Sequence, residues 1–213
     1  MKKSEVIQEI RRQKIVAVIR GDDYQTGLNA CKACIDGGLT AIEMAFSNNS
    51  AADIIKELSN QYKDHDDVII GAGTVLDAPT ARMAIIAGAC YIVSPSFDKE
   101  TALLCNQYGV PYIPGCMTIK EIVTAMKYGA EIVKIFPAHI LGTSFMHDVK
   151  APLPQVSMMV TGGVNFDNVC EFLEAGAESA GIGGEFNLLA ARGDFTTITK
   201  QARDYVEKVR GRT

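Results

Sequence analysis

The sequence has no tryptophan, only three histidines and only a small excess of negative charge. Its 21 basic and 25 acidic residues give a formal net charge of −4, which provides no field to attract nucleic acid or an anionic membrane. No stretch approaches the roughly 18 to 20 consecutive apolar residues that span a bilayer, and residues 1–7 lack the apolar core of a signal peptide. We therefore expect a cytoplasmic protein that binds neither nucleic acid nor a membrane.

The sequence also offers little for a metal site, because its histidines are scattered and no His pair has ligand spacing. Cys31 and Cys34 have the C-x-x-C spacing of redox and metal sites, but they also fit two positions on a helix packed against the core. We favour the second interpretation. The other cysteines stand in apolar surroundings and are interpreted as core residues: Cys90, Cys105, Cys116 and Cys170. We expect no metal and no cofactor.

One unit recurs along the chain: a helical stretch, a glycine that can end the helix, and a short apolar strand. Five such strands are indicated, within residues 39–43, 90–93, 111–114, 131–137 and 180–183. Three more apolar segments, at residues 15–20, 68–75 and 157–163, bring the number of strands to eight. Helical patterns separate them, for example at residues 50–58, 79–87, 119–127 and 168–175.

These eight strands read as continuous apolar runs, which is typical of parallel strands buried on both faces. Eight βα units of this size predict an α/β protein with a single (β/α)8 TIM barrel over residues 1–213. Residues 3–13 predict an extra N-terminal helix that closes the barrel floor. The alternative is an open doubly wound sheet, but the chain has no G-x-G-x-x-G motif that opens a helix.

Lys134 is the residue most indicative of function, because it stands alone in the apolar, β-branched segment 131–137. Desolvating an ammonium group is expensive, so a lysine buried in a strand tends to lose its proton. A neutral amine in a dry pocket is the nucleophile that forms a Schiff base with a ketone. Lys134 therefore predicts a class of reaction as well as a place in the fold.

In a barrel of this kind the reactive groups lie at the carboxyl ends of the strands. Glu43, the sole ionisable group of its strand, reaches the same mouth as Lys134 and is a candidate general acid and base. The alternative is a Lys134–Glu43 ion pair that has only a structural role and fills the barrel interior. Thr74 and Thr161 can donate hydroxyl hydrogen bonds to a substrate, but threonine is also common at strand ends. Two glycine doublets could cradle a phosphate or make plain turns: Gly162-Gly163 and Gly183-Gly184.

Taken together these motifs resemble the 2-keto-3-deoxy-6-phosphogluconate/4-hydroxy-2-oxoglutarate aldolase family, the class I pyruvate aldolases, over nearly the whole chain. The motifs that carry the resemblance are Ile15-Val16-Ala17-Val18-Ile19-Arg20, Gly71-Ala72-Gly73-Thr74-Val75, Val133-Lys134-Ile135-Phe136-Pro137-Ala138 and Thr161-Gly162-Gly163-Val164. The motifs G-A-G-T-V, K-x-F-P-A and T-G-G-V, in that order, form a combination that is specific to this family.

The resemblance implies a metal-free homotrimer that cleaves a 2-keto-4-hydroxy acid to pyruvate and an aldehyde, glyoxylate or glyceraldehyde 3-phosphate. By this match Lys134 forms the Schiff base and Glu43 is the general acid and base. Thr74 and Thr161 would contact the substrate, Pro95 and Phe136 would form the pocket walls, and the two glycine turns would hold the distal phosphate.

The sequence departs from the family pattern at two positions. Many members place an arginine four residues after the glutamate to bind the substrate carboxylate, but here Ser47 stands there, and we predict that Arg20 replaces it. Many members carry a serine at the phosphate, where this chain has Glu185. Either Glu185 points outward, or the preferred substrate lacks a phosphate, because a carboxylate repels a phosphate dianion. We slightly favour the second explanation.

Three other functions remain open at this stage. The barrel could be an aldolase for an unphosphorylated keto-deoxy sugar acid. It could be a phosphate-sugar isomerase or synthase in which Lys134 binds phosphate or forms an ion pair. It could also be a non-catalytic barrel that binds a sugar acid. A Schiff base on Lys134 would distinguish the aldolases from the last two.

Overall fold

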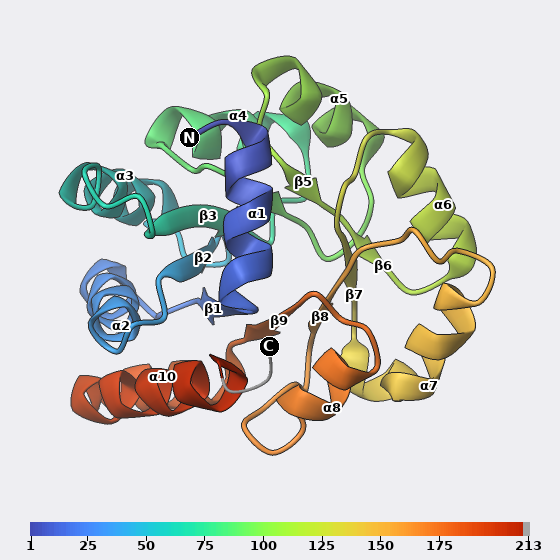
Figure 1. The fold of residues 1–213 in the computed structure, drawn as a ribbon. Coiled ribbons are helices and arrows are strands. Elements are labelled where there is room, and N and C mark those ends of the chain that lie inside the picture. Colours follow the sequence, from blue (N-terminus) through green and yellow to red (C-terminus); the bar gives the residue numbers. More distant parts are fainter. Residues whose placement is uncertain (211–213) are drawn as a thin grey trace.

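The computed structural model describes residues 1–210, which fold into a ring of parallel strands surrounded by helices (Figure 1). The strands are β1 (Ile15–Ile19), β2 (Ala41–Ala45), β3 (Ile69–Gly73), β4 (Ile92–Val93), β5 (Tyr112–Ile113), β6 (Gly115–Cys116), β7 (Val133–Ile135), β8 (Met158–Thr161) and β9 (Ser179–Ile182). The helices are α1 (Lys3–Gln13), α2 (Tyr24–Asp36), α3 (Ala51–Gln61), α4 (Ala78–Ala87), α5 (Lys99–Tyr108), α6 (Ile119–Lys127), α7 (Ala138–Lys150), α8 (Val169–Glu174), α9 (Gly184–Ala191) and α10 (Phe195–Arg210).

The sheet is a nearly closed parallel barrel, which confirms the predicted fold class. Its order is β5-β4-β3-β2-β1-β9-β8-β7-β6, so the two ends of the sheet are consecutive in the chain. The strand predicted at residues 111–114 corresponds to β5, and a second short strand that was not predicted, β6, follows directly after Pro114. Proline has no N–H to donate to a strand ladder. The Pro114 carbonyl still accepts a hydrogen bond of 2.8 Å from the Lys134 N–H. The barrel therefore has eight βα units although its residues form nine strands.

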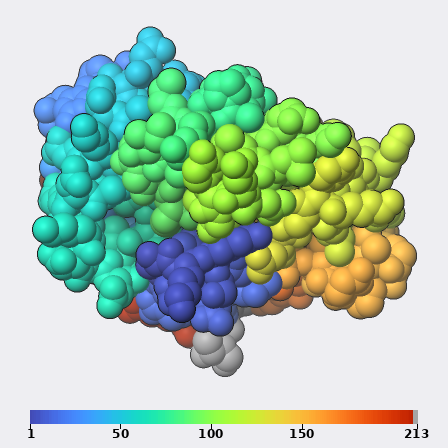
Figure 2. Space-filling view, turned by 90° about the horizontal axis from the view of Figure 1, so that it is seen from above, coloured from blue at the N-terminus to red at the C-terminus, as the bar shows by residue number. Residues whose placement is uncertain are grey.

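Helix α1 closes the amino-terminal end of the barrel, as the sequence predicted. Its buried residues Val6, Ile7 and Ile10 pack in one cluster with side chains from the barrel interior: Val16, Ala41, Ile69, Tyr91, Val93, Ile113, Ile132 and Met159. We call this cluster the floor. Figure 2 shows α1 (dark blue) at one end of the molecule, beside the wall formed by α4 and α5 (green).

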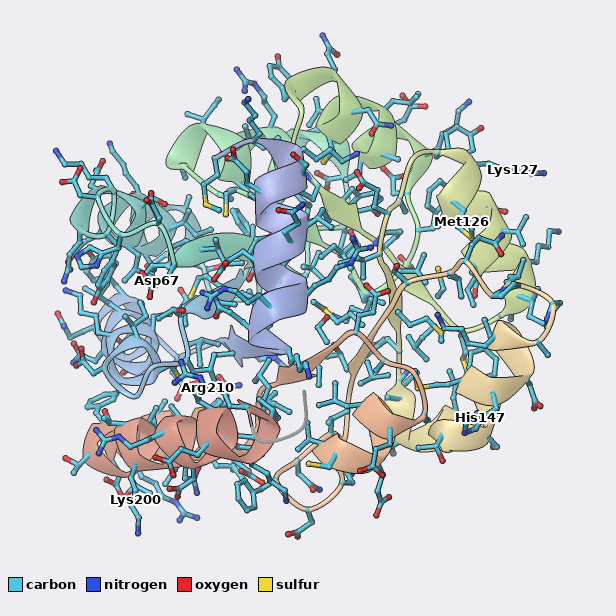
Figure 3. The ribbon with its side chains drawn as sticks, in the orientation of Figure 1. Asp67, Met126, Lys127, His147, Lys200 and Arg210 are labelled. Carbon is cyan, nitrogen blue, oxygen red and sulfur yellow. The ribbon has the colours of Figure 1, made fainter. Side chains whose placement is uncertain are left out.

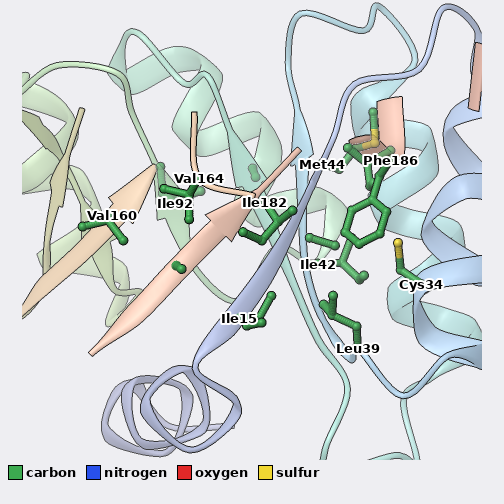
Figure 4. Packing of buried hydrophobic residues seen from close by; sticks show 14 of the residues in the cluster. Ile15, Cys34, Leu39, Ile42, Met44, Ile92, Val160, Val164, Ile182 and Phe186 are labelled. Carbon is green, nitrogen blue, oxygen red and sulfur yellow. The ribbon is translucent and has the colours of Figure 1, made fainter. Parts of the chain in front are cut away.

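A second, larger apolar cluster fills the space between the outer face of the barrel and the surrounding helices. Figure 4 shows part of it, with Cys34 on α2 directed toward Ile42 and Phe186. Cys31 and Cys34 are fully buried and form no disulfide, and burial raises the pKa of the Cys31 thiol to about 12. The interpretation of this C-x-x-C pair as core residues is therefore confirmed.

Several helices begin at an aspartate whose carboxylate accepts a hydrogen bond from the N–H of a threonine three residues later. The pattern D-x-x-T starts α2 at Asp23, α4 at Asp77 and α5 at Asp98. Each carboxylate satisfies one of the N–H groups that a helix start leaves unpaired. These bonds lower the pKa of Asp23 and Asp77. A short sequence motif thus fixes where the helices around the barrel begin.

Charged side chains lie mainly on the outside of the helical ring, as Lys127 on α6 and Lys200 on α10 illustrate (Figure 3). Within residues 1–210, no helix combines the length and the apolar character needed to cross a membrane. The same residues contain no group of three or more His, Cys, Asp or Glu side chains arranged to hold a metal ion.

Candidate active site

A cavity of about 500 Å³ opens at the carboxyl ends of the strands and brings together every site residue predicted from the sequence. These lining residues are Arg20, Glu43, Thr74, Pro95, Lys134, Phe136, Thr161, Gly162, Gly163, Gly183, Gly184 and Glu185. We call this end of the barrel the mouth. Asn165, Asn187, Val18, Val164, Gly181 and Leu188 also line it.

The alternation of side chains along a strand explains why the polar residues face inward. Residues two positions apart point to the same side of a strand. Ile132 belongs to the floor, so Lys134 also faces the barrel interior, one level higher, while Val133 between them packs against the helices. Ala41 and Glu43 are related in the same way on β2, and Met159 and Thr161 on β8.

Lys134 and Glu43 form the centre of the cavity. The Lys134 Nζ atom lies 3.8 Å from Glu43 Oε1 and 5.2 Å from the centre of the Phe136 ring. Both side chains are buried, with 5% of Lys134 and 1% of Glu43 exposed. Glu43 Oε2 has no hydrogen-bond partner among residues 1–210. A buried ion pair that only stabilises the fold needs its remaining hydrogen-bonding positions satisfied, so this geometry favours a reactive pair over a structural one.

Two glycines make room for the polar side chains of the mouth. A Cβ atom on Gly73 would lie 2.1 Å from Glu43 Oε1, and one on Gly181 would lie 2.5 Å from Thr161 Oγ1. Real Cβ atoms do not approach other heavy atoms so closely. Glycine at these strand positions therefore permits Glu43 and Thr161 to occupy the interior.

Thr74 and Thr161 stand at the ends of β3 and β8 with polar atoms available to a ligand. Thr161 Oγ1 is buried and has no partner among the described residues. Thr74 has a φ of 55°, a left-handed conformation that is rare for a β-branched residue. Such strain concentrates at functional sites, where the surrounding structure maintains it.

Arg20 is exposed at the end of β1, and two asparagines hold its backbone in place. The Arg20 N–H donates to Asn187 Oδ1 at 2.8 Å, and the Arg20 carbonyl accepts from Asn48 Nδ2 at 2.9 Å. Asn48 is buried, and its amide also reaches the carbonyls of Gly21 and Asp23. Ser47, the position of the missing family arginine, is exposed and is not a lining residue of the cavity. The sequence analysis did not identify Asn48 or Asn187 as site residues.

The glycine doublets line one part of the mouth, where α9 begins. Gly162 and Gly163 have positive φ values of 92° and 72°, and Gly183 precedes the first turn of α9. The Glu185 carboxylate, in that first turn, accepts a hydrogen bond of 2.9 Å from the Tyr205 hydroxyl on α10. Glu185 is half-buried, and its carboxylate is bonded to the fully buried Tyr205.

Comparison with known proteins identifies the family. The model of the family described as KDPG and KHG aldolase matches residues 6–201. The chain belongs to this family. It is 31% identical to a 2-dehydro-3-deoxy-phosphogluconate aldolase of Treponema pallidum, over 96% of this chain and 97% of the relative. It is 30% identical to a 2-dehydro-3-deoxy-6-phosphogalactonate aldolase of Escherichia coli, over 92% and 94% of the two chains.

Solved structures of similar fold support the same assignment. A structure of native KDPGal has a TM-score of 0.84 and 30% sequence identity, and covers 92% of this chain and 94% of that chain. The KDPG and KHG aldolase family consists of lyases, so the chain is an aldolase. The strand-end cavity described above is its candidate active site.

Proposed function

We propose that this chain is a Schiff-base aldolase that cleaves a 2-keto-4-hydroxy acid to pyruvate and an aldehyde. The observation that supports this function best is the pairing of buried Lys134 with buried Glu43 at 3.8 Å inside the cavity at the carboxyl ends of the strands. The lysine supplies a nucleophile, and the carboxylate beside it supplies a proton acceptor. The substrates named for two of its relatives, 2-dehydro-3-deoxy-phosphogluconate and 2-dehydro-3-deoxy-6-phosphogalactonate, are both of this class.

The reaction requires one nucleophile and a group that carries protons. The neutral Lys134 amine attacks the C2 ketone, and water leaves to give an iminium ion. Glu43 then accepts the proton of the C4 hydroxyl while the C3–C4 bond breaks. The electron pair of that bond forms an enamine, and the aldehyde departs. Protonation of the enamine at C3 and hydrolysis of the iminium release pyruvate and restore the Lys134 amine.

The other lining residues position the keto acid. Arg20 binds the substrate carboxylate in place of the family arginine that Ser47 replaces. The hydroxyls of Thr74 and Thr161 donate to the carboxylate or to the reacting oxygens, and Pro95 and Phe136 form apolar walls. The backbone N–H groups of the two glycine turns face the end of the substrate farthest from the carboxylate. The open oxygen of Glu43 and the open hydroxyl of Thr161 support these roles.

Borohydride trapping with pyruvate tests the proposed chemistry. Reduction fixes an iminium as a stable secondary amine, so mass spectrometry should find a pyruvate adduct on Lys134. The variant Lys127→Met serves as a matched control, because Lys127 is an exposed lysine on the outer face of α6 (Figure 3). It should keep the adduct, and Lys134→Met should lose it. Absence of an adduct at every pH from 6 to 9 would instead support an isomerase, a synthase or a binding barrel.

We further propose that the aldolase is a cytoplasmic homotrimer. Support for an assembly comes from large apolar side chains exposed around α4, namely Leu76, Met83 and Ile86, which are 54% to 70% exposed. Apolar groups that gather on a surface mark interaction sites. Light scattering should give a mass three times the 23.0 kDa of one chain. Fractionation of the source cells tests the location.

A further inference from the structure

Two basic side chains, Arg20 and Lys134, and two carboxylates, Glu43 and Glu185, line the mouth. Lys134 lies against Glu43, whereas the partner of Glu185 is the neutral hydroxyl of Tyr205. No ion pair within 4.0 Å joins Glu185 to a cation among residues 1–210. The negative charge of Glu185 therefore acts on whatever occupies the part of the cavity next to α9.

Tyr205 holds this carboxylate in place. Its side chain is fully buried, and its ring makes edge-on contacts with Phe166 and Phe186 at 5.2 Å and 5.7 Å between ring centres. If Glu185 turned away, the hydroxyl of Tyr205 would lose its partner inside the protein, which is costly. Burial and the neighbouring Glu185 raise the pKa of Tyr205, so the hydroxyl keeps the proton that it donates.

A carboxylate held in one position favours ligands that donate a hydrogen bond to it and disfavours ligands that carry negative charge. A carboxylate only accepts hydrogen bonds, so it pairs with a donor such as the hydroxyl of a sugar acid. A phosphate dianion offers further negative charge and only acceptor oxygens, and the repulsion grows as the cavity excludes water. The helix start at Gly183 and Gly184 already has a negative group, Glu185, in its first turn. The requirements at this end of the cavity are met by a neutral, hydroxylated group.

We propose that the Glu185–Tyr205 pair determines substrate choice by accepting a hydrogen bond from a hydroxylated tail and rejecting a phosphorylated one. The substrate class is then an unphosphorylated 2-keto-3-deoxy sugar acid. This inference rests on the aldolase function proposed above, and concerns only which aldehyde leaves the site.

The test compares kcat/KM for 2-keto-3-deoxygluconate and for its 6-phosphate. The wild-type protein should prefer the unphosphorylated acid by about tenfold or more. Glu185→Gln keeps the shape and an oxygen that accepts from Tyr205 but removes the charge. It should reduce this preference by about tenfold or more, mainly by raising kcat/KM for the 6-phosphate. Tyr205→Phe should reduce the preference less, because it frees the carboxylate but leaves its charge.

A control variant separates local from global electrostatics. Glu171→Gln removes an exposed carboxylate of α8 that does not line the cavity, and it should leave the preference unchanged. A wild-type preference for the 6-phosphate, or an unchanged preference in Glu185→Gln, would overturn the inference. Pyruvate trapping on wild-type Lys134 distinguishes the two proposals. An adduct together with a phosphate preference rejects the selection by Glu185 and retains the aldolase.

Discussion

The floor and the mouth of this barrel are built from the same strands and differ in almost everything else. Ile132, directly before β7, is a floor residue and Lys134 on β7 is a mouth residue, and on β2 the corresponding residues are Ala41 and Glu43. The floor is apolar and filled by α1, whereas the mouth holds a cavity of about 500 Å³. Residues two positions apart along a strand point to the same side. Here one of them stabilises the fold and the other performs chemistry. Substitutions at paired positions can test how complete this separation is.

The largest expected effect comes from the pair Ile132 and Lys134. Lys134→Met should lower kcat/KM by at least about 10³-fold, because it removes the nucleophile. Ile132→Val, two residues earlier on the same side of the strand, should lower the free energy of unfolding by about 0.5–1.5 kcal/mol and preserve kcat/KM. Steady-state kinetics and chemical denaturation measure the two effects. Loss of activity in Ile132→Val without loss of folding would show that the floor takes part in catalysis.

The two glycines of β3 provide the next contrast. A Cβ atom on Gly73 would meet the Glu43 carboxylate, so Gly73→Ala should displace that carboxylate and lower kcat by about 10²-fold. A Cβ atom on Gly71 would lie 2.3 Å from the Tyr91 ring in the floor. Gly71→Ala should instead destabilise the fold by about 1–3 kcal/mol through overpacking. Equal losses of stability in the two variants would contradict the distinction between the two levels.

A smaller effect is expected at Asn187, which supports the mouth through the backbone of Arg20. Asn187→Ala removes the hydrogen bond to the Arg20 N–H, so it should raise KM for pyruvate in the condensation direction about tenfold. Arg20→Ala should raise the same KM at least as much, with kcat changed less. If Arg20→Ala leaves KM unchanged, Arg20 does not replace the missing family arginine. A change in Asn187→Ala alone would then assign Asn187 a contact with the substrate.

The smallest effect concerns the layer outside both levels, where Cys31, Cys105 and Cys116 lie. Burial raises the pKa of these three thiols to about 12, so at pH 8 they carry their protons and react poorly. Alkylation of the folded protein should therefore be slow, and it should become complete on unfolding in guanidinium. Reactivity should rise with pH only as the pH approaches these values. Rapid alkylation of Cys31 at pH 8 would indicate that the helix layer opens.

The sequence predicted those features that depend on local periodicity. Continuous apolar runs indicated the strands, and a lone lysine and a lone glutamate within such runs indicated the centre of the mouth. The separation of β5 and β6 at Pro114 was not predicted, because the surrounding residues are as apolar as in the other strands. The contacts of Asn48 and Asn187 with Arg20, and of Tyr205 with Glu185, could not be predicted either. They join residues 20 or more positions apart, and nothing in their local pattern distinguishes them from ordinary polar or core residues.

The position of α1 also sets an order of events for the chain. Helix α1 precedes the other described elements along the chain, yet the floor residues that cover its apolar face come from strands and strand-flanking segments as late as Met159 on β8 (Figure 1). Val6, Ile7 and Ile10 therefore cannot be fully buried until most of the ring has formed. Contacts over such long sequence separations are slow to form. A helix that comes before every strand in the sequence is thus among the last elements to reach its final place, and its docking marks the completion of the barrel.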